Sequence, residues 1–370
     1  MWYTWLGLAA ITLFHTNNPF DRSICKGVLM KSPKRFTRRE LLASTAGAAF
    51  VAPIIFFEGN KGFAMSQSIN DTNVKSMYVT IRDDILMTAG FESIDEGLRV
   101  CGIPGVEIAA DRDYTCRPIL ATMQNPRIHF DKDEDIRLLK DQMESSGIRI
   151  SSFLASNNFN APNRNAELDW VVRIVDTASK VGAQAVRIDA IMENADNMPR
   201  QQREDIFHDC VTTILQKTDG LTVNLGIENH GIQGNDPKFL LGLLKRVKSP
   251  RLGITMDTGN FYWAGYPLDE LYSILNELAP YTKHTHVKNI DYPADMQNIR
   301  REVGYGYEKY VCPIPDGNID IPKVVGFLKK AGYHGDLCIE DESIGKYDIP
   351  GRRVNFSRAS EYLKEIIQKS

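Results

Sequence analysis

The sequence lacks several features that mark other classes of protein. Beyond its N-terminal segment it has no block of Lys or Arg, and its formal net charge is only −3. Phosphate binding needs clustered positive charge, so this balance argues against a nucleic-acid partner. No internal repeat or low-complexity linker divides the chain after residue 66. We therefore expect a small neutral or weakly charged substrate.

Cysteine is also sparse and carries no recognisable pattern. The six cysteines include no C-x-x-C pair and no spacing typical of a zinc knuckle or a disulfide framework. Structural cysteines are the favoured interpretation. Cys25 lies in the N-terminal segment, and the five that remain cannot all pair with one another within a chain.

The length and composition are those of a globular protein. The chain has 370 residues, of which 43% are apolar and 25% charged. A single α/β barrel takes about 250 residues. One such domain over residues 70–370, preceded by an N-terminal extension, fits this length better than two independent domains.

Residues 30–64 have the layout of an export signal. Basic residues and the pair Arg38-Arg39 precede a mostly apolar run from Leu41 to Phe57, and small residues follow near Ala64. The core Thr37-Arg38-Arg39-Glu40-Leu41-Leu42 resembles a twin-arginine signal, which predicts periplasmic export and no membrane association after signal removal. The alternative is a retained membrane anchor. Residues 1–29 are interpreted as an upstream extension.

The rest of the chain alternates short β-branched runs with helical periodicity, which is typical of βα units around a parallel sheet. Eight strands are expected, and eight is the strand number of the (β/α)8 TIM barrel. They are Met77–Ile81, Gly105–Ile108, Ile148–Leu154, Ala185–Ile188, Thr222–Ile227, Leu252–Met256, Tyr281–Val287 and Asp336–Ile339.

Helices are expected between these strands, several of them followed by a glycine suited to a left-handed C-cap: Gly147, Gly182, Gly220 and Gly332. The clearest helices are Glu134–Ser145, Glu167–Val181, Gln201–Gln216, Pro237–Arg246, Leu268–Leu278, Ile321–Ala331 and Arg358–Gln368.

Two connections, 109–131 and 289–318, are longer than a barrel requires, and long loops at the C-terminal rim usually build or cover the active site. The second contains candidate substrate contacts, with a solvated surface excursion as the alternative: Arg300, Arg301, Tyr305 and Tyr307.

Four strands each end in a residue that can bind a metal. In a strand, alternate side chains face opposite sides, so apolar residues facing the helices direct their neighbours into the barrel. Applied to strands five to eight, this alternation turns the following residues inward at the C-terminal ends: Glu228, Asp257, His286 and Glu340. Each alone would be read as a salt-bridge or capping residue, but four at one level predict a shared site.

Three carboxylates in a barrel mouth repel one another and lose solvation, so they need a cation or raised pKa values. An oxygen-rich set with one imidazole suits one divalent ion, Mn²⁺, Mg²⁺ or Co²⁺ first, with Zn²⁺ also accommodated.

The sequence resembles the xylose isomerase-like barrel superfamily, specifically its sugar phosphate isomerase/epimerase group. The motifs that match follow the order and spacing of that group: Gly226-Ile227-Glu228-Asn229-His230-Gly231, Met256-Asp257-Thr258-Gly259-Asn260, His286-Val287-Lys288-Asn289, Pro315-Asp316-Gly317-Asn318-Ile319-Asp320 and Gly332-Tyr333-His334-Gly335.

The resemblance implies a metal-dependent sugar isomerase or epimerase, with one ion held by Glu228, Asp257, His286 and Glu340. The two glutamates would double as acid/base groups in proton abstraction through an enediolate. The same ion and base also suit two alternatives, a lyase or dehydratase acting on a keto-sugar or 3-keto-glycoside and, without catalysis, a periplasmic sugar-binding protein. A homo-oligomer is left open.

Five further residues are expected to contact the carbohydrate: Glu107, Arg187, His230, Asn260 and Lys288. Glu107 and Arg187 point inward from the second and fourth strands, and a buried structural ion pair is an equal alternative for both. Asn260 stands where many relatives have His, and Tyr292 stands where ketose epimerases often have Arg. These departures speak against a trinuclear zinc cluster and against ketose 3-epimerase specificity. His284 is expected to be a hydrogen-bonded core histidine.

Overall fold

The computed structural model describes residues 76–120, 127–195 and 197–369 of the chain. The expected upstream extension and twin-arginine-type signal lie outside these residues, so both stay predictions. Within the described part of the chain, no helix has the combination of length and apolarity needed to cross a membrane.

Eight parallel strands of the described region form a closed ring. Their hydrogen-bonded order is β12-β1-β2-β5-β6-β7-β8-β9. A parallel bridge between Val287 and Ile339 joins β9 to β12, and the N–H of Val287 donates to the carbonyl of Cys338 at 2.7 Å. The ring confirms the predicted (β/α)8 barrel. Its strands are β1 (Tyr78–Arg82), β2 (Gly105–Ala110), β5 (Arg149–Ala155), β6 (Ala185–Ile188), β7 (Asn224–Glu228), β8 (Leu252–Asp257), β9 (Thr282–His286) and β12 (Asp336–Ile339).

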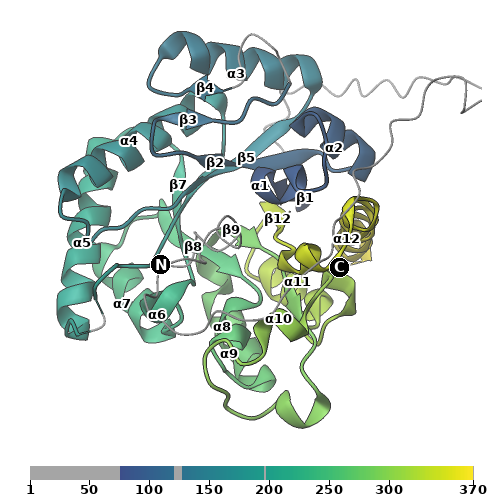
Figure 1. Cartoon of the computed structure of the whole chain (residues 1–370). Coiled ribbons are helices and arrows are strands. Elements are labelled where there is room, and N and C mark those ends of the chain that lie inside the picture. The colour runs from purple at the N-terminus through teal and green to yellow at the C-terminus, as the bar shows by residue number, and fades with distance from the viewer. Residues whose placement is uncertain (1–75, 121–126, 196, 370) are drawn as a thin grey trace, which may run out of the picture. The chain divides into compact units, whose positions relative to one another are not determined.

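Helices cover the outside of this ring (Figure 1). Their apolar faces pack on the outward apolar side chains of the strands, such as Val79 and Ile81 of β1, to form one continuous buried core. The helices are α1 (Asp83–Met87), α2 (Ile94–Cys101), α3 (Asp133–Ser146), α4 (Arg164–Val181), α5 (Arg200–Lys217), α6 (Gly231–Gly234), α7 (Pro237–Val247), α8 (Asn260–Trp263), α9 (Leu268–Leu278), α10 (Tyr307–Tyr310), α11 (Ile321–Lys330) and α12 (Ile349–Lys369).

Two of the four glycines expected as C-caps have that role, whereas Thr218 and Ala331 cap α5 and α11 in place of Gly220 and Gly332. Gly147 and Gly182 cap α3 and α4 with φ of 70° and 78°, the left-handed conformation that glycine adopts without strain. The last helix differs from expectation because it begins at Ile349 rather than Arg358. Its first turn contains Pro350, a residue that helices tolerate at their start.

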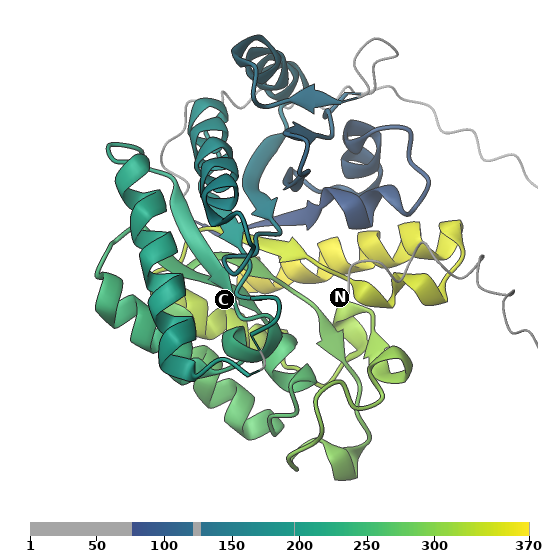
Figure 2. The same ribbon diagram turned by 60° about the vertical axis from the view of Figure 1, so that its left-hand side comes forward.

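Contacts with the residues that follow α1 hold the added N-terminal part of α12, residues 349–357. The guanidinium of Arg352 donates to the carbonyl of Thr88 at 2.8 Å, and that of Arg353 donates to the carbonyl of Ala89 at 2.9 Å. The last helix of the chain therefore lies beside the first strand and its helices, as Figure 2 shows. This contact completes the helix layer over the neighbouring strands β12 and β1.

The two long connections form small structures of their own. The first contributes β3 (Thr115–Cys116) and β4 (Ile128–His129), which pair antiparallel beside β2. The second contributes β10 (Asn289–Ile290) and β11 (Val311–Cys312), also an antiparallel pair. Short 3-10 turns complete the described chain: η1 (Ala279–Tyr281), η2 (Ala294–Met296), η3 (Ile314–Asp316) and η4 (Glu342–Lys346).

Candidate metal site

The four predicted ligands converge at the carboxyl ends of adjacent strands. Glu228, Asp257 and His286 are the last residues of β7, β8 and β9, and Glu340 follows β12 directly. One ligand atom from each lies within 4.8 Å of those of the other three, and all four side chains are buried. The parallel register, in which Asp257 pairs with His286, sets them at one level.

Each glutamate directs one oxygen to the centre of this cluster and the other to an arginine. Oε1 of Glu228 lies 2.8 Å from Nδ1 of His286, while its Oε2 accepts from the guanidinium of Arg187. Oε2 of Glu340 lies 3.5 Å from the same Nδ1, while its Oε1 accepts from Arg82. The two arginines therefore fix the outer oxygens and leave the inner ones facing one another.

Asp257 has one oxygen that no hydrogen bond satisfies. Its Oδ1 accepts from the backbone N–H groups of Gly259 and Asn260, at 2.8 and 2.6 Å. Its Oδ2 has no hydrogen-bond partner among the described residues and lies 3.3 Å from Nζ of Lys288. A buried carboxylate oxygen without a donor is costly, and a cation is the partner that such an oxygen suits. The donor set therefore fits a divalent ion.

The pKa values show how far the site is from charge balance. Burial and the negative charges of Glu340 and Glu228 raise the pKa of Asp257 well above its ordinary value, although Lys288 opposes this. Burial disfavours the charged form of His286, yet the surrounding carboxylates Glu340, Glu107 and Glu228 raise its pKa to about 10. Its Nδ1 then carries a proton at neutral pH, in the position where a metal ligand atom must have none.

The pKa values of the two glutamates, Glu228 and Glu340, are lowered rather than raised. Burial raises the pKa of Glu228, but Arg187 and His286 lower it to well below its usual range. The pKa of Glu340 is likewise held low, because His286, Lys288 and Arg82 together outweigh its burial. Both side chains are consequently ionised, as cation binding requires.

A second layer of charged groups lies behind His286. Its Nε2 is 2.8 Å from Oε2 of Glu107, whose Oε1 is 2.9 Å from Nε2 of His284. Nδ1 of His284 is 2.8 Å from Oδ1 of Asp336. His284 is therefore hydrogen-bonded and fully buried, in agreement with the prediction made for it.

This second layer has ligand-type atoms close enough together to hold an ion, since those of Glu107, His284, His286 and Cys338 also lie within 4.8 Å of one another. The carboxylate and imidazole atoms are, however, already paired with each other. Burial raises the pKa of the Cys338 thiol to about 12, so it does not offer a thiolate. A hydrogen-bonded network accounts for this cluster better than a second ion.

The comparisons with known proteins identify the family and the fold of the chain. Residues 99–366 match the family described as Xylose isomerase-like TIM barrel. The chain belongs to this family. An uncharacterized protein of Methanocaldococcus jannaschii is 28% identical over 139 residues, which are 36% of this chain and 42% of that protein. The chain thus matches less than half the length of this curated relative.

Solved structures of the xylose isomerase-like fold are similar to this chain at low identity. The IOLI protein with a binding zinc atom has a TM-score of 0.59 at 15% identity, and the match covers 79% of this chain and 99% of that one. A D-tagatose 3-epimerase-like protein has a TM-score of 0.56 at 20% identity, covering 79% and 97%. The 3-keto-D-glucoside 4-epimerase YcjR of E. coli has a TM-score of 0.56 at 13% identity, and the match covers 77% of this chain and 99% of that one. At such identities these similarities show the fold alone.

Three predicted substrate contacts of this family member lie beside the proposed ligands. Nδ1 of His230 is 3.2 Å from Asp189 and 3.9 Å from Glu228, and its side chain is 27% exposed. The side-chain nitrogen of Asn260 has no partner among the described residues. Lys288 extends its ammonium to within 3.2 Å of Glu340. All three offer polar groups at the site, and substrate contact by them stays a prediction.

Glu107 and Arg187 are placed differently. Both oxygens of Glu107 face histidines, and the guanidinium of Arg187 contacts Glu228, Asp189 and the carbonyl of Ala155. Both side chains are only 1% exposed. The geometry favours the alternative given for these two residues, a buried ionic network that orients the ligands, over direct substrate contact.

One expectation for the long connection after β9 is wrong. Arg301 is buried, and its guanidinium donates to backbone carbonyls including those of Tyr262 and Tyr266 while stacking over the ring of Tyr292. Its two terminal nitrogens hold the backbone of the loop. The backbone carbonyls that a long loop must satisfy explain why a buried arginine is needed there.

The other three candidates of this loop have different surroundings. The guanidinium of Arg300 stacks over Tyr266, and Tyr305 is stacked on Tyr310. The hydroxyl of Tyr307 donates to Glu342, whose carboxylate is 3.4 Å from Nζ of Lys288. Of these candidates, Tyr307 is thus connected to the proposed site.

Three residues of the site were missed by sequence reasoning although the same alternation identifies them. On β1 the apolar pair Val79 and Ile81 faces the helices, which turns Arg82 inward beside Glu340. Asp189 is the next inward position after Arg187, and Asp336 is the inward position before Cys338. Extending the face analysis from metal ligands to all charged residues finds each of them.

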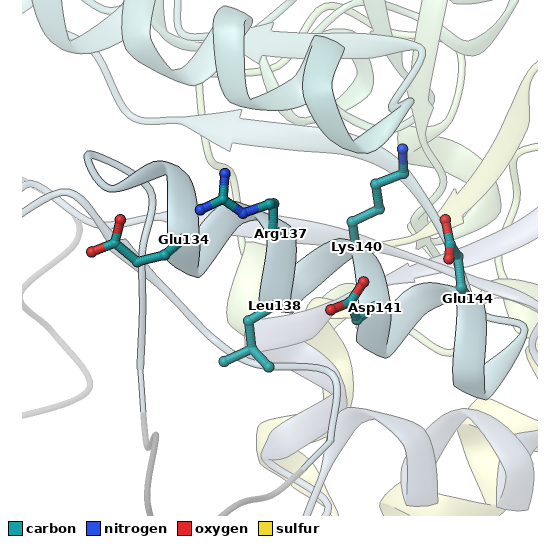
Figure 3. A pocket seen from close by; sticks show the side chains of 6 residues that line it. All are labelled: Glu134, Arg137, Leu138, Lys140, Asp141 and Glu144. Carbon is teal, nitrogen blue, oxygen red and sulfur yellow. The ribbon is translucent and has the colours of Figure 1, made fainter.

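A hollow on the outer surface lies apart from this site. Figure 3 shows that its lining comes from α3 alone and mixes charges of both signs. The lining residues are Glu134, Arg137, Leu138, Lys140, Asp141 and Glu144. No proposed ligand or substrate contact is among them, so this hollow takes no part in the chemistry considered below.

Proposed function

We propose that this protein is a metal-dependent sugar isomerase or epimerase that uses one divalent ion. The convergence of Glu228, Asp257, His286 and Glu340 at the carboxyl ends of four strands supports this proposal above all. Three oxygen donors and one nitrogen favour Mn²⁺, Mg²⁺ or Co²⁺, and Zn²⁺ is accommodated. The zinc-binding IOLI protein, which shares the fold, is consistent with such an ion.

When bound, the ion would polarise the carbonyl of a keto- or aldo-sugar and acidify the neighbouring C–H bond. The chain supplies the groups that move the proton. Glu228 and Glu340 are ionised, they come from different strands, and their outer oxygens are held by arginines. One would remove a proton to form the enediolate and the other would return it, each contributing about 10²–10⁴-fold. Return to the neighbouring carbon gives isomerisation, and return to the opposite face gives epimerisation.

The substrate is proposed to be a small carbohydrate with few charges. The side chains of His230, Asn260 and Lys288 each offer nitrogen donors beside the ligands, an arrangement suited to hydroxyl and carbonyl oxygens. The D-tagatose 3-epimerase-like protein and the 3-keto-D-glucoside 4-epimerase that share the fold support a sugar of this kind.

We also propose export to the periplasm by the segment 30–64, with removal of the signal. An export route with Arg38-Arg39 at its core predicts that changing both to Lys leaves the protein in the cytoplasm. Cell fractionation of the full chain and of the double variant R38K/R39K tests this. Equal periplasmic yield of the two would contradict it.

Incubation of metal-loaded protein with candidate sugars in D₂O tests the chemistry. Solvent deuterium in the recovered sugar supports an isomerase or epimerase, and its loss in both E228Q and E340Q assigns the proton transfer to the glutamates. An ultraviolet-absorbing enone or a released leaving group would replace the proposal with a lyase. Tight binding without turnover would replace it with a sugar receptor.

A further inference from the structure

A chain of four buried side chains runs through the barrel interior behind the proposed ion. It leads from His286 to Glu107 of β2, then to His284 of β9 and to Asp336 of β12, with contacts of 2.8, 2.9 and 2.8 Å. The far end is fixed as well, because the hydroxyl of Thr80 donates to Asp336 at 2.6 Å.

The chemistry of these contacts assigns the protons. An ionised carboxylate has only acceptors, so each imidazole nitrogen that faces one must carry the hydrogen. Nε2 of His286 therefore donates to Glu107 and cannot be a metal ligand. That leaves Nδ1, whose proton faces the inner oxygens of Glu228 and Glu340 at 2.8 and 3.5 Å, in the place that a bound ion would take over from the proton.

We infer that Glu107, held by His284 and Asp336, is a positioning residue that fixes the ring of His286 with Nδ1 toward the ion. The inference rests on the proposed metal site and deepens it. Hydrogen bonds to the outer nitrogen of a ligating histidine orient the ring and strengthen it as a ligand, and their loss typically costs 10–100-fold in metal affinity.

Two substitutions of Glu107 distinguish a role in orienting His286 from a role in packing alone. Alanine removes both acceptors, so Nε2 of His286 loses its anchor. Glutamine keeps one acceptor and supplies one donor. In E107Q the amide oxygen can accept from His286 only if the amide NH₂ group faces His284. Nε2 of His284 must then be unprotonated, and the neutral ring can still donate from Nδ1 to Asp336. E107Q is thus expected to keep the ion site and to change the protonation of a histidine that does not touch the ion.

The experiment measures Mn²⁺ affinity by the electron paramagnetic resonance signal of free Mn²⁺, for wild type, E107A, E107Q, H286A and D83N. Asp83 is the matched control because it is a buried carboxylate that contacts Ala109 and Arg117 rather than a ligand. We expect E107A to weaken binding by about 10–100-fold and E107Q by less than about tenfold. D83N should bind like wild type and H286A should lose the ion.

A second measurement covers the case in which E107A fails to fold. Nitrogen-15 spectra of the histidine side chains in Zn²⁺-loaded wild type should show His286 protonated at Nε2 and bound through Nδ1. In E107Q, Nε2 of His284 should move to the unprotonated range. If wild type binds the ion and both E107A and E107Q bind it as tightly as wild type, the inference is overturned while the metal site stands. The same holds if His286 binds the ion through Nε2. If wild type binds no ion, the proposed site fails and the inference fails with it.

Discussion

The ammonium of Lys288 lies 3.3 Å from Oδ2 of Asp257, the one oxygen of the four-residue cluster that accepts no hydrogen bond within the described structure. The same ammonium is 3.2 Å from Oε2 of Glu340. A single positive charge thus stands beside two of the three carboxylates that an ion would neutralise. Lys288 and the ion therefore contribute to the same charge balance.

The first prediction follows from this shared role. Replacing Lys288 by Met leaves buried carboxylates without their counter-charge, which costs about 3–5 kcal/mol in the free energy of unfolding. Urea denaturation in the presence of a chelator should show this full loss, and saturating Mn²⁺ should reduce it. K283M is the control, because Lys283 lies in β9 on the face opposite to His284 and His286. An equal loss with and without Mn²⁺ would mean that the two cations do not share the carboxylates.

The second prediction concerns the arginine that holds Glu228. Arg187 is 1% exposed and contacts two carboxylates, so R187M leaves buried charges unpaired and should lower the free energy of unfolding by about 3–5 kcal/mol. R246M removes a surface ion pair with Asp205 and should cost less than about 1 kcal/mol. Denaturant titrations of both variants check this. Similar losses for the two would show that burial of the Arg187 pair carries no special penalty.

The third prediction is a pH dependence at the start of α1. Burial and the charge of Asp84 raise the pKa of Asp83 to about 6 from an ordinary 3.8, despite the Ala109 N–H and Arg117. Between these values the folded form binds the proton more tightly than the unfolded form. The stability that Asp83 contributes is therefore complete below pH 4 and is lost as the pH rises through 6.

Substitution isolates this contribution. The free energy of unfolding of D83N, relative to wild type, should increase by about 2 kcal/mol between pH 4 and pH 7, since each unit of pKa shift corresponds to about 1.36 kcal/mol and part of the shift is expressed only below pH 4. Thermal or urea unfolding at several pH values measures the difference. A difference that does not vary with pH would contradict the raised pKa.

The fourth prediction contrasts two neighbouring arginines of the long loop. Arg301 satisfies several backbone carbonyls inside the protein, so R301M leaves buried acceptors unpaired and should cost more than about 3 kcal/mol. R300M removes only an exposed contact with the ring of Tyr266, worth about 0.5–1 kcal/mol. Urea denaturation of the two variants measures their free energies of unfolding. Equal effects would show that the loop does not depend on Arg301.

Much of the fold could be predicted because it depends on local patterns. Ala185–Ile188 and Asp336–Ile339 were predicted with the bounds that the structure gives, since alternation and flanking turn residues mark them clearly. The beginning of α12 could not be predicted. Pro350 and Gly351 suggest a loop, and only Arg352 and Arg353, through carbonyls distant in sequence, hold that turn in the helix.

The candidate site likewise has a part that the sequence predicts and a part that it does not. Inward direction is a property of the strand, so the alternation placed Glu228, Asp257, His286 and Glu340 together. Which inward residues bond with one another depends on neighbouring strands and their register. The sequence therefore left open whether Glu107 contacts substrate or forms a buried ion pair, and it did not distinguish the buried Arg301 from the exposed Arg300.

The most direct test of the account is the position of the ion. Crystals of the protein loaded with Mn²⁺ and measured at the manganese absorption edge locate it by anomalous scattering. The account predicts one peak per chain, shared by Glu228, Asp257, His286 through Nδ1, and Glu340. A peak elsewhere, or none in crystals grown with saturating Mn²⁺, would contradict it.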